Sequence, residues 1–220
     1  MGAFPAEVVP LAVATAVSPL PLVVLLVVLL TPRAVPNGVA FACGWASALL
    51  LVGAATATLV GAGAGLDERG TVVSSLEVLV GLLLLLLAVR QWSRRPRRGA
   101  EATVPRWLLV ADRSTPWRAF AIGAVLVLVN PKNLALTVAA AGAIAGSGAG
   151  AGAELTALLL FAALGTAGLA VPLLLRISMG SRVAGLLTRW RRWLVRHGTP
   201  IACAVLAVIG ALLVLRGLAG

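Results

Sequence analysis

The chain has 220 residues, of which 60% are hydrophobic and 11% are charged, and its net charge is +11. A soluble domain keeps roughly a quarter of its residues charged because its surface faces water, so this composition excludes an ordinary soluble protein. The positive charge does not indicate nucleic-acid binding, since the basic residues lie beside long apolar stretches. The sequence therefore predicts an all-α integral membrane protein in which residues 1–220 form a single transmembrane domain.

Apolar stretches of about 20 residues, the length needed to cross a bilayer, recur along the chain. They predict six transmembrane helices, at residues 8–30, 38–62, 71–90, 118–141, 153–176 and 198–218. A polar loop at 91–117 separates one half, 1–90, from the other, 118–220. Each half contributes three spans and the second half begins on the opposite side, which permits a 3+3 inverted repeat.

The first predicted span is interrupted near its middle by Ser18-Pro19-Leu20-Pro21. Proline lacks an amide donor and clashes with the preceding helical turn, so two prolines in three positions should break this helix. In hydrocarbon, a broken helix persists only where it is buried in protein or lines a cavity. The alternative is an ordinary proline kink.

Glu77 lies about two turns into the third predicted span and is the best candidate for a carboxylate near a transport pathway. A position at the water-facing lip of the span is the simpler interpretation. Fifteen of the 18 basic residues fall in the loops after the first, third and fifth spans. By the positive-inside rule these loops are cytoplasmic, so both termini of this multi-pass protein should lie outside.

The fourth predicted span carries Asn130-Pro131-Lys132-Asn133, which repeats the polar-Pro pattern of the first span 112 residues later. Two interrupted helices at matching places in two halves indicate a transport site near the bilayer midplane. Lys132 is the only lysine of the chain and the only charge deep in a predicted span. A buried lysine readily gives up its proton, which would suit proton coupling. The alternative is a structural lysine that caps free carbonyl groups beside the break.

Residues 182–196 follow helical amphipathic spacing, with apolar residues on one face and arginines elsewhere. A basic helix with tryptophans beside a span should lie on the inner leaflet against anionic headgroups. A solvated basic loop is the alternative. The residues expected to contact headgroups are Arg182, Arg189, Trp190, Arg192 and Trp193.

The sequence carries none of the catalytic signatures that would indicate an enzyme. Its single histidine, His197, has no Cys/His cluster around it, so neither a metal site nor a cofactor is expected. Cys43 and Cys203 lie inside predicted spans and are expected to be small buried residues. Small residues in the fifth span (Gly165, Thr166 and Gly168) permit a homodimer without requiring it.

The Ser18-Pro19-Leu20-Pro21 and Asn130-Pro131-Lys132-Asn133 segments resemble the broken helices of the lysine-exporter superfamily of six-helix bacterial exporters. Within it, the chain is similar to the glycopeptidolipid- and sulfolipid-addressing proteins over essentially its whole length. Amino-acid exporters of the superfamily usually carry a Pro-Gly-Pro-type first break, from which this chain departs.

This resemblance implies export of a lipid or glycolipid envelope component across the bacterial plasma membrane. It also implies that Ser18, Pro19, Pro21, Asn130, Pro131 and Lys132 belong to the transport site. The alternatives are an exporter of an amino acid or another small solute or cation, and a membrane scaffold that assists a partner enzyme of envelope-lipid synthesis or a pump. Membrane lipids are expected partners in every case.

Overall fold

The computed structural model describes residues 8–63, 69–93 and 115–219 of the chain. All regular structure in these ranges is helical. The elements are α1 (Val8–Ala16), α2 (Pro19–Val28), α3 (Ala34–Gly63), α4 (Arg69–Ser93), α5 (Pro116–Leu128), α6 (Pro131–Gly146), α7 (Ala151–Met179), the 3₁₀ helix η2 (Gly180–Val183) and α8 (Ala184–Ala219).

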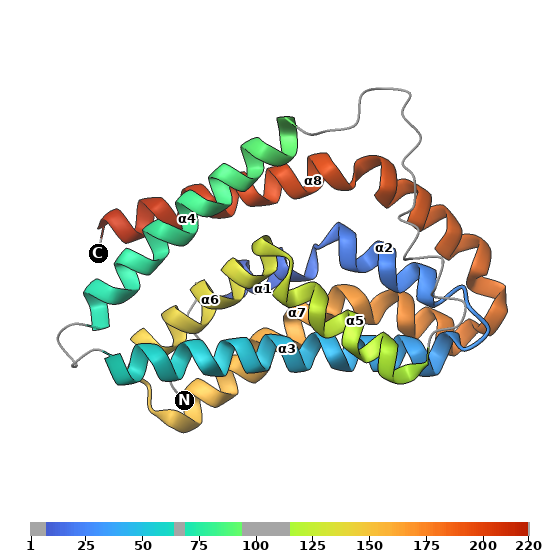
Figure 1. Ribbon diagram of the computed structural model, residues 1–220, viewed down its shortest axis with the longest axis horizontal. Coiled ribbons are helices and arrows are strands. Elements are labelled where there is room, and N and C mark those ends of the chain that lie inside the picture. The colour runs from blue at the N-terminus through green and yellow to red at the C-terminus, as the bar shows by residue number, and fades with distance from the viewer. Residues whose placement is uncertain (1–7, 64–68, 94–114, 220) are drawn as a thin grey trace.

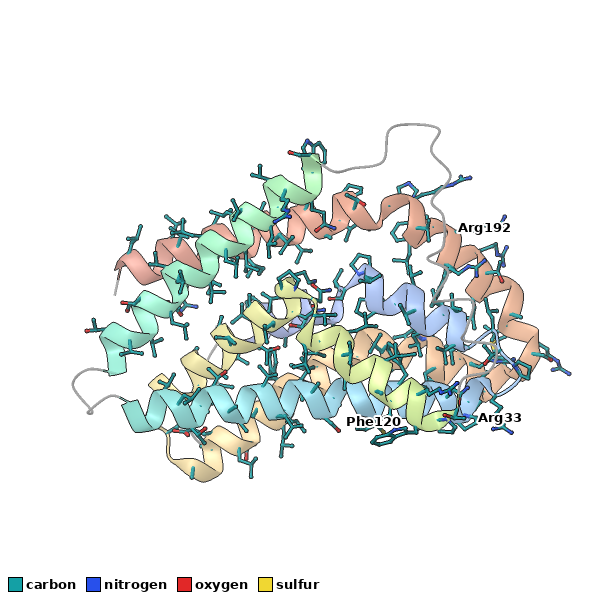
Figure 2. All side chains as sticks on the ribbon, in the orientation of Figure 1. Arg33, Phe120 and Arg192 are labelled. Atoms are coloured by element: carbon teal, nitrogen blue, oxygen red, sulfur yellow. The ribbon has the colours of Figure 1, made fainter. Side chains whose placement is uncertain are left out.

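The long helices run roughly side by side along the longest axis of the molecule (Figure 1). One layer holds α3, α5 and α7 with the shorter helices α1, α2 and α6, and α4 packs along α8 in a second layer. Arg33, in the turn after α2, and Arg192, in α8, lie toward the same end of the molecule (Figure 2). We call this the Arg-rich end; α8 terminates at the opposite end.

By length and hydropathy, three helical segments could each cross a membrane: Ala34–Gly61, Thr71–Ser93 and Ala151–Ala219. Two bent helix pairs, α1 with α2 and α5 with α6, are also long and apolar enough to cross a membrane when each pair is counted as one span. They raise the number of candidate spans to five. The third segment is 69 residues long because it runs through α7, η2 and α8. The chain is thus a multi-pass membrane protein, whereas the six crossings and the inverted repeat remain predictions.

Both interruptions predicted from the prolines are present. The axis turns by 45° between α1 and α2 and by 73° between α5 and α6. In each case a proline is the first residue of the new helix, where its missing N–H would have had no intrahelical acceptor.

The interface between α3 and α5 depends on glycine. A Cβ added at Gly44 would lie 2.7 Å from the carbonyl carbon of Phe120, and one at Gly123 would lie 3.0 Å from that of Phe41. The two backbones therefore touch from both sides of the crossing, as small residues permit in membrane helix pairs. This contact fixes the position of α5 and of the break at its end.

The structure corrects two expectations. The predicted helix at 182–196 is not separate from the last span, because α8 is continuous from Ala184 to Ala219 with Pro200 inside it. Cys203 is buried as expected, but Cys43 is exposed on the surface of α3. Among the small residues of α7, Gly168 packs against the backbone of α1.

Candidate functional site

The first break places Ser18 between α1 and α2 in an extended conformation, with φ −111° and ψ 102°. Its side chain does not cap α2. Pro19 and Pro21 fall in the first turn of that helix, where amide donors have no acceptor one turn back. The freed hydroxyl of Ser18 is 2% exposed and available for a long-range contact.

The second break repeats this geometry with a different cap. Asn130 has φ −90° and ψ 103°, and its side-chain oxygen accepts a hydrogen bond from the amide of Lys132 at 3.1 Å. Pro131 is the first residue of α6. Asparagine is among the best N-cap residues because its side chain satisfies one orphan amide of the first turn.

The backbone hydrogen bonds around the two breaks match at an offset of 112 residues. Just before each break, one amide completes the preceding helix, and just after it the capping residue's carbonyl accepts the first bond of the next helix. The matching bonds are Val17 N–Val13 O (2.9 Å) with Val129 N–Val125 O (2.8 Å), and Leu22 N–Ser18 O (3.2 Å) with Leu134 N–Asn130 O (3.0 Å).

Lys132 joins the two breaks. Its ammonium donates to the carbonyl oxygen of Ala14 at 2.7 Å and to that of Val17 at 3.1 Å, both at the C-terminal end of α1. Lys132 is 6% exposed. Two hydrogen bonds from a charged donor contribute about 1.5–3 kcal/mol each, which is enough to offset the roughly 3 kcal/mol that a cation at the bilayer centre costs on insertion scales. The lysine therefore caps the other broken helix rather than its own.

A second contact crosses between the breaks beside Lys132. The Ser18 hydroxyl donates to the side-chain oxygen of Asn133 at 2.7 Å. Asn133 is fully buried, and its side-chain NH₂ group has no hydrogen-bond partner among the residues that the structure describes. Thr137 donates to the backbone carbonyl of Asn133 at 2.8 Å and helps to hold this turn of α6 in place.

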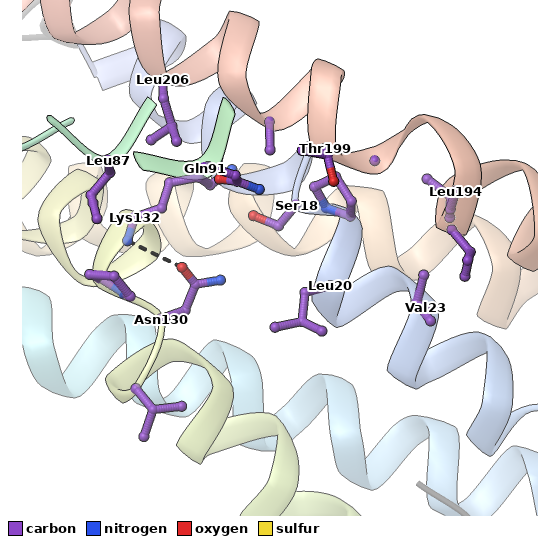
Figure 3. A pocket seen from close by; sticks show the side chains of 16 residues that line it. Ser18, Leu20, Val23, Leu87, Gln91, Asn130, Lys132, Leu194, Thr199 and Leu206 are labelled. Atoms are coloured by element: carbon purple, nitrogen blue, oxygen red, sulfur yellow. Dashed lines mark hydrogen bonds between the residues drawn. The ribbon is translucent and has the colours of Figure 1, made fainter. Parts of the chain in front are cut away.

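A cavity of about 480 Å³ adjoins the two breaks. Polar side chains of Ser18, Asn130 and Lys132 meet Gln91 of α4 and Thr199 of α8 around it (Figure 3). The rest of its lining is largely apolar and includes Leu20, Val23, Leu87, Val129, Leu194 and Leu206. An apolar cavity of this size with a few convergent polar groups is typical of a ligand site.

The cavity extends from the breaks toward the Arg-rich end. A smaller hollow of about 260 Å³ shares Leu87, Gln91 and Thr199 with it and adds Arg90. On the other side of the breaks α6 is packed against α4: a Cβ at Gly142 would lie 2.8 Å from a Leu76 methyl. We therefore expect access from the side of Arg90 only.

A groove of about 650 Å³ lies between α2, α7 and α8. Among the residues predicted to contact headgroups, Arg189, Trp190 and Trp193 line it. Its remaining lining is apolar: Leu22, Leu26, Gly168, Val171, Pro172, Leu186 and Leu194. Arg182 and Arg192 are exposed and lie outside this lining. Leu194 also lines the first cavity, so this one side chain borders both the groove and the cavity.

The structure thus brings together most of the residues predicted for the site, but not all of them. Pro21 and Asn133 are buried beside the cavity rather than in its lining. Glu77 is 8% exposed, so its side chain is buried, and it does not line the cavity.

Sequence reasoning missed Gln91 and Thr199. Gln91 follows Arg90 at the end of an apolar run, and no motif around it indicates a site. Thr199-Pro200 is a further polar-Pro pair, so the same pattern that marked the two breaks could have indicated Thr199.

No group of three or more His, Cys, Asp or Glu residues that could hold a metal ion occurs within 8–63, 69–93 and 115–219. The site's donors are hydroxyl, amide and ammonium groups and backbone carbonyls.

Comparison with known proteins identifies the family. The family model described as Sap, sulfolipid-1-addressing protein, matches residues 8–219. The chain belongs to this family. The resemblance of its two broken helices to sulfolipid-addressing proteins is therefore confirmed over nearly the full length. No curated protein and no solved structure matches the chain.

Proposed function

We propose that this member of the sulfolipid-1-addressing family exports a lipid or glycolipid component of the cell envelope outward across the bacterial plasma membrane. The observation that carries the proposal is the pair of broken helices joined by Lys132 beside a partly polar cavity. Discontinuous helices that meet at a central site are the usual architecture of secondary transporters.

The proposal includes six crossings with both termini outside. At 1.5 Å per residue, a single helix of 69 residues would be roughly 100 Å long, more than three times the thickness of the hydrocarbon layer. Counting α7 and α8 separately, and each bent pair as one span, gives six crossings. The Arg-rich end then faces the cytoplasm by the positive-inside rule. The matching hydrogen bonds 112 residues apart support an inverted repeat.

The mechanism we propose is alternating access, with this conformation open toward the cytoplasm. The cavity reaches toward Arg90, while Gly142 and Gly146 of α6 pack closely against Leu76 and Val73 of α4 on the outer side. Outward opening would require α6 to separate from α4 and the cavity to close between α2 and α8. Protonation and deprotonation of Lys132 would supply a coupling step to a proton gradient, since its ammonium holds the two breaks together.

The substrate we propose is amphipathic. A cavity of about 480 Å³ accommodates a headgroup but not a whole lipid, and the apolar groove beyond Leu194 would hold an acyl chain. Arg189 at the groove would attract an anionic headgroup, and Trp190 and Trp193 suit the interfacial layer. The family's name, which refers to a sulfolipid, agrees with an anionic lipid.

The test is transport by the purified chain in liposomes that contain an acyl-labelled fluorescent sulfated glycolipid, with dithionite quenching reporting movement between leaflets. Wild-type protein should accelerate movement over empty liposomes. Lys132→Met should reduce it to the empty-liposome rate, because the two contacts to α1 are lost. Leu212→Met, at a position 46% exposed on α8, is the matched control and should transport normally.

Other outcomes would select the alternatives. Transport of a radiolabelled amino acid instead of the glycolipid would indicate a small-solute exporter. No translocation of either, together with stable co-purification of an envelope-lipid enzyme, would favour a scaffold. Normal glycolipid transport by a folded Lys132→Met variant would remove Lys132 from the mechanism.

A further inference from the structure

One pair of matching positions in the two halves of the site differs in charge. In the second broken helix, position 132 is lysine, and its ammonium donates hydrogen bonds to the carbonyl oxygens of Ala14 and Val17. The position 112 residues earlier is Leu20, which cannot donate. The carbonyl oxygens that match those of Ala14 and Val17 belong to Leu126 and Val129, at the end of α5.

These two oxygens have been left without a donor. Among the residues that the structure describes, no hydrogen bond reaches the carbonyl oxygen of Leu126 or that of Val129. The 73° turn after Val129 carries the Asn130 amide away from the end of α5, and Asn130 uses its side chain for the next helix instead. Val129 is exposed on the molecule, but in a membrane an unpaired carbonyl group without water is costly, so a partner is expected here.

The cavity reaches this end of α5. Val129 and Asn130 both line it, and so does Leu20 of α2, which is 47% exposed (Figure 3). A small solute in the cavity could therefore approach the end of α5 without any rearrangement. The C-terminal end of a helix also carries the negative end of its dipole, which favours a cation.

We propose that the carbonyl oxygens of Leu126 and Val129 bind a small monovalent cation from the cavity. Helix C-terminal ends and unwound carbonyls coordinate cations in transporters with broken helices. The matching end of α1 already holds a cation, the Lys132 ammonium, at hydrogen-bonding distance. The cation is either an alkali ion or the primary ammonium group of a solute, since both are coordinated by carbonyl oxygens.

The test uses thermal unfolding of the detergent-solubilised chain, followed by tryptophan fluorescence, at constant ionic strength. Choline chloride, whose cation is large and has no N–H, is replaced stepwise by NaCl, KCl or methylammonium chloride. A cation at about ten times its Kd should raise the Tm by about 4 °C, and the rise should saturate. The ion that is effective identifies the alkali or the ammonium source.

Leu20→Lys tests the position of the site, because it places a tethered ammonium where the cation would bind. This variant should lose the cation-dependent rise, while the neutral control Leu20→Met should keep it. If Leu20→Lys does not fold, Leu20→Gln takes its place, since its amide would donate to the same carbonyls. A wild-type Tm that no tested cation raises saturably, or the same rise in the donor variant, would overturn the proposal.

The cation site lies in the cavity of the proposed exporter, but its test measures binding and not transport. Cation binding without glycolipid movement would leave this site standing and remove the proposed function. Glycolipid movement without saturable cation binding would leave the proposed function standing and remove the cation site.

Discussion

The crossing of α3 and α5 offers a direct test of what holds the second break in place. Gly44→Ala would put a Cβ 2.7 Å from the carbonyl carbon of Phe120. Non-bonded carbon atoms are most favourable at about 3.5–4.0 Å, so the two helices must separate by roughly 1 Å. The obstacle is backbone, so it cannot turn aside as a side chain would.

The expected loss of stability follows from two opposing effects. Overpacking of this kind costs about 1–3 kcal/mol, and replacing a helical glycine by alanine returns about 0.5–1 kcal/mol. Gly44→Ala should therefore destabilise the chain by about 1–2 kcal/mol. Gly61→Ala is the control in the same helix, because a Cβ there would meet nothing within 4 Å, and it should stabilise by about 0.5–1 kcal/mol.

The assay is thermal unfolding in detergent. A difference of about 2 kcal/mol between the variants corresponds to about 4–8 °C in Tm at this chain length. Gly123→Ala should resemble Gly44→Ala, and the double variant should lose less than the sum, because one separation of the helices relieves both clashes. A Tm for Gly44→Ala equal to that of Gly61→Ala would refute the close approach of α3 and α5.

Two other predictions concern the site itself. Ser18→Ala removes the donor to the buried Asn133 side chain and should cost about 1–3 kcal/mol in thermal unfolding; adding Asn133→Leu should recover part of the loss, and no recovery would count against the pairing. In a variant without native cysteines, Thr199→Cys should react from the cytoplasmic side of membrane vesicles with a water-soluble maleimide, while Leu76→Cys should not. Equal labelling of both would contradict one-sided access.

The proposed exporter mechanism rests on contacts between parts of the chain that are far apart in sequence. Lys132 reaches the end of α1 and Ser18 reaches Asn133, so both contacts must change together if the two broken helices move. Such a pair of linked contacts suits a switch between two conformations, because one displacement of α6 would release both. The transport experiment with Lys132→Met addresses this link directly.

Local chemistry is what the sequence alone determined. The breaks lie where predicted because the effect of proline on a helix needs no distant partner: the ring and the missing N–H act within one turn. The apolar stretches likewise predicted a membrane protein without any knowledge of distant contacts, because the length and hydropathy of each stretch are local properties. The amphipathic spacing predicted for 182–196 agrees with the structure, in which Leu187 is buried and Arg189 is exposed. Membership of the sulfolipid-1-addressing family also followed from these local motifs.

Long-range geometry was decided only by the tertiary structure. The sequence left open whether Lys132 caps a carbonyl or faces a cavity, and the fold lets it do both. It could not show that Glu77 is buried away from the cavity, or that Gln91 and Thr199 border it. Such positions depend on how helices cross and how deeply each lies. Those features arise from close contacts between residues that are distant in the sequence, such as Gly44 with Phe120 and Gly168 with Ala16, which no local pattern encodes.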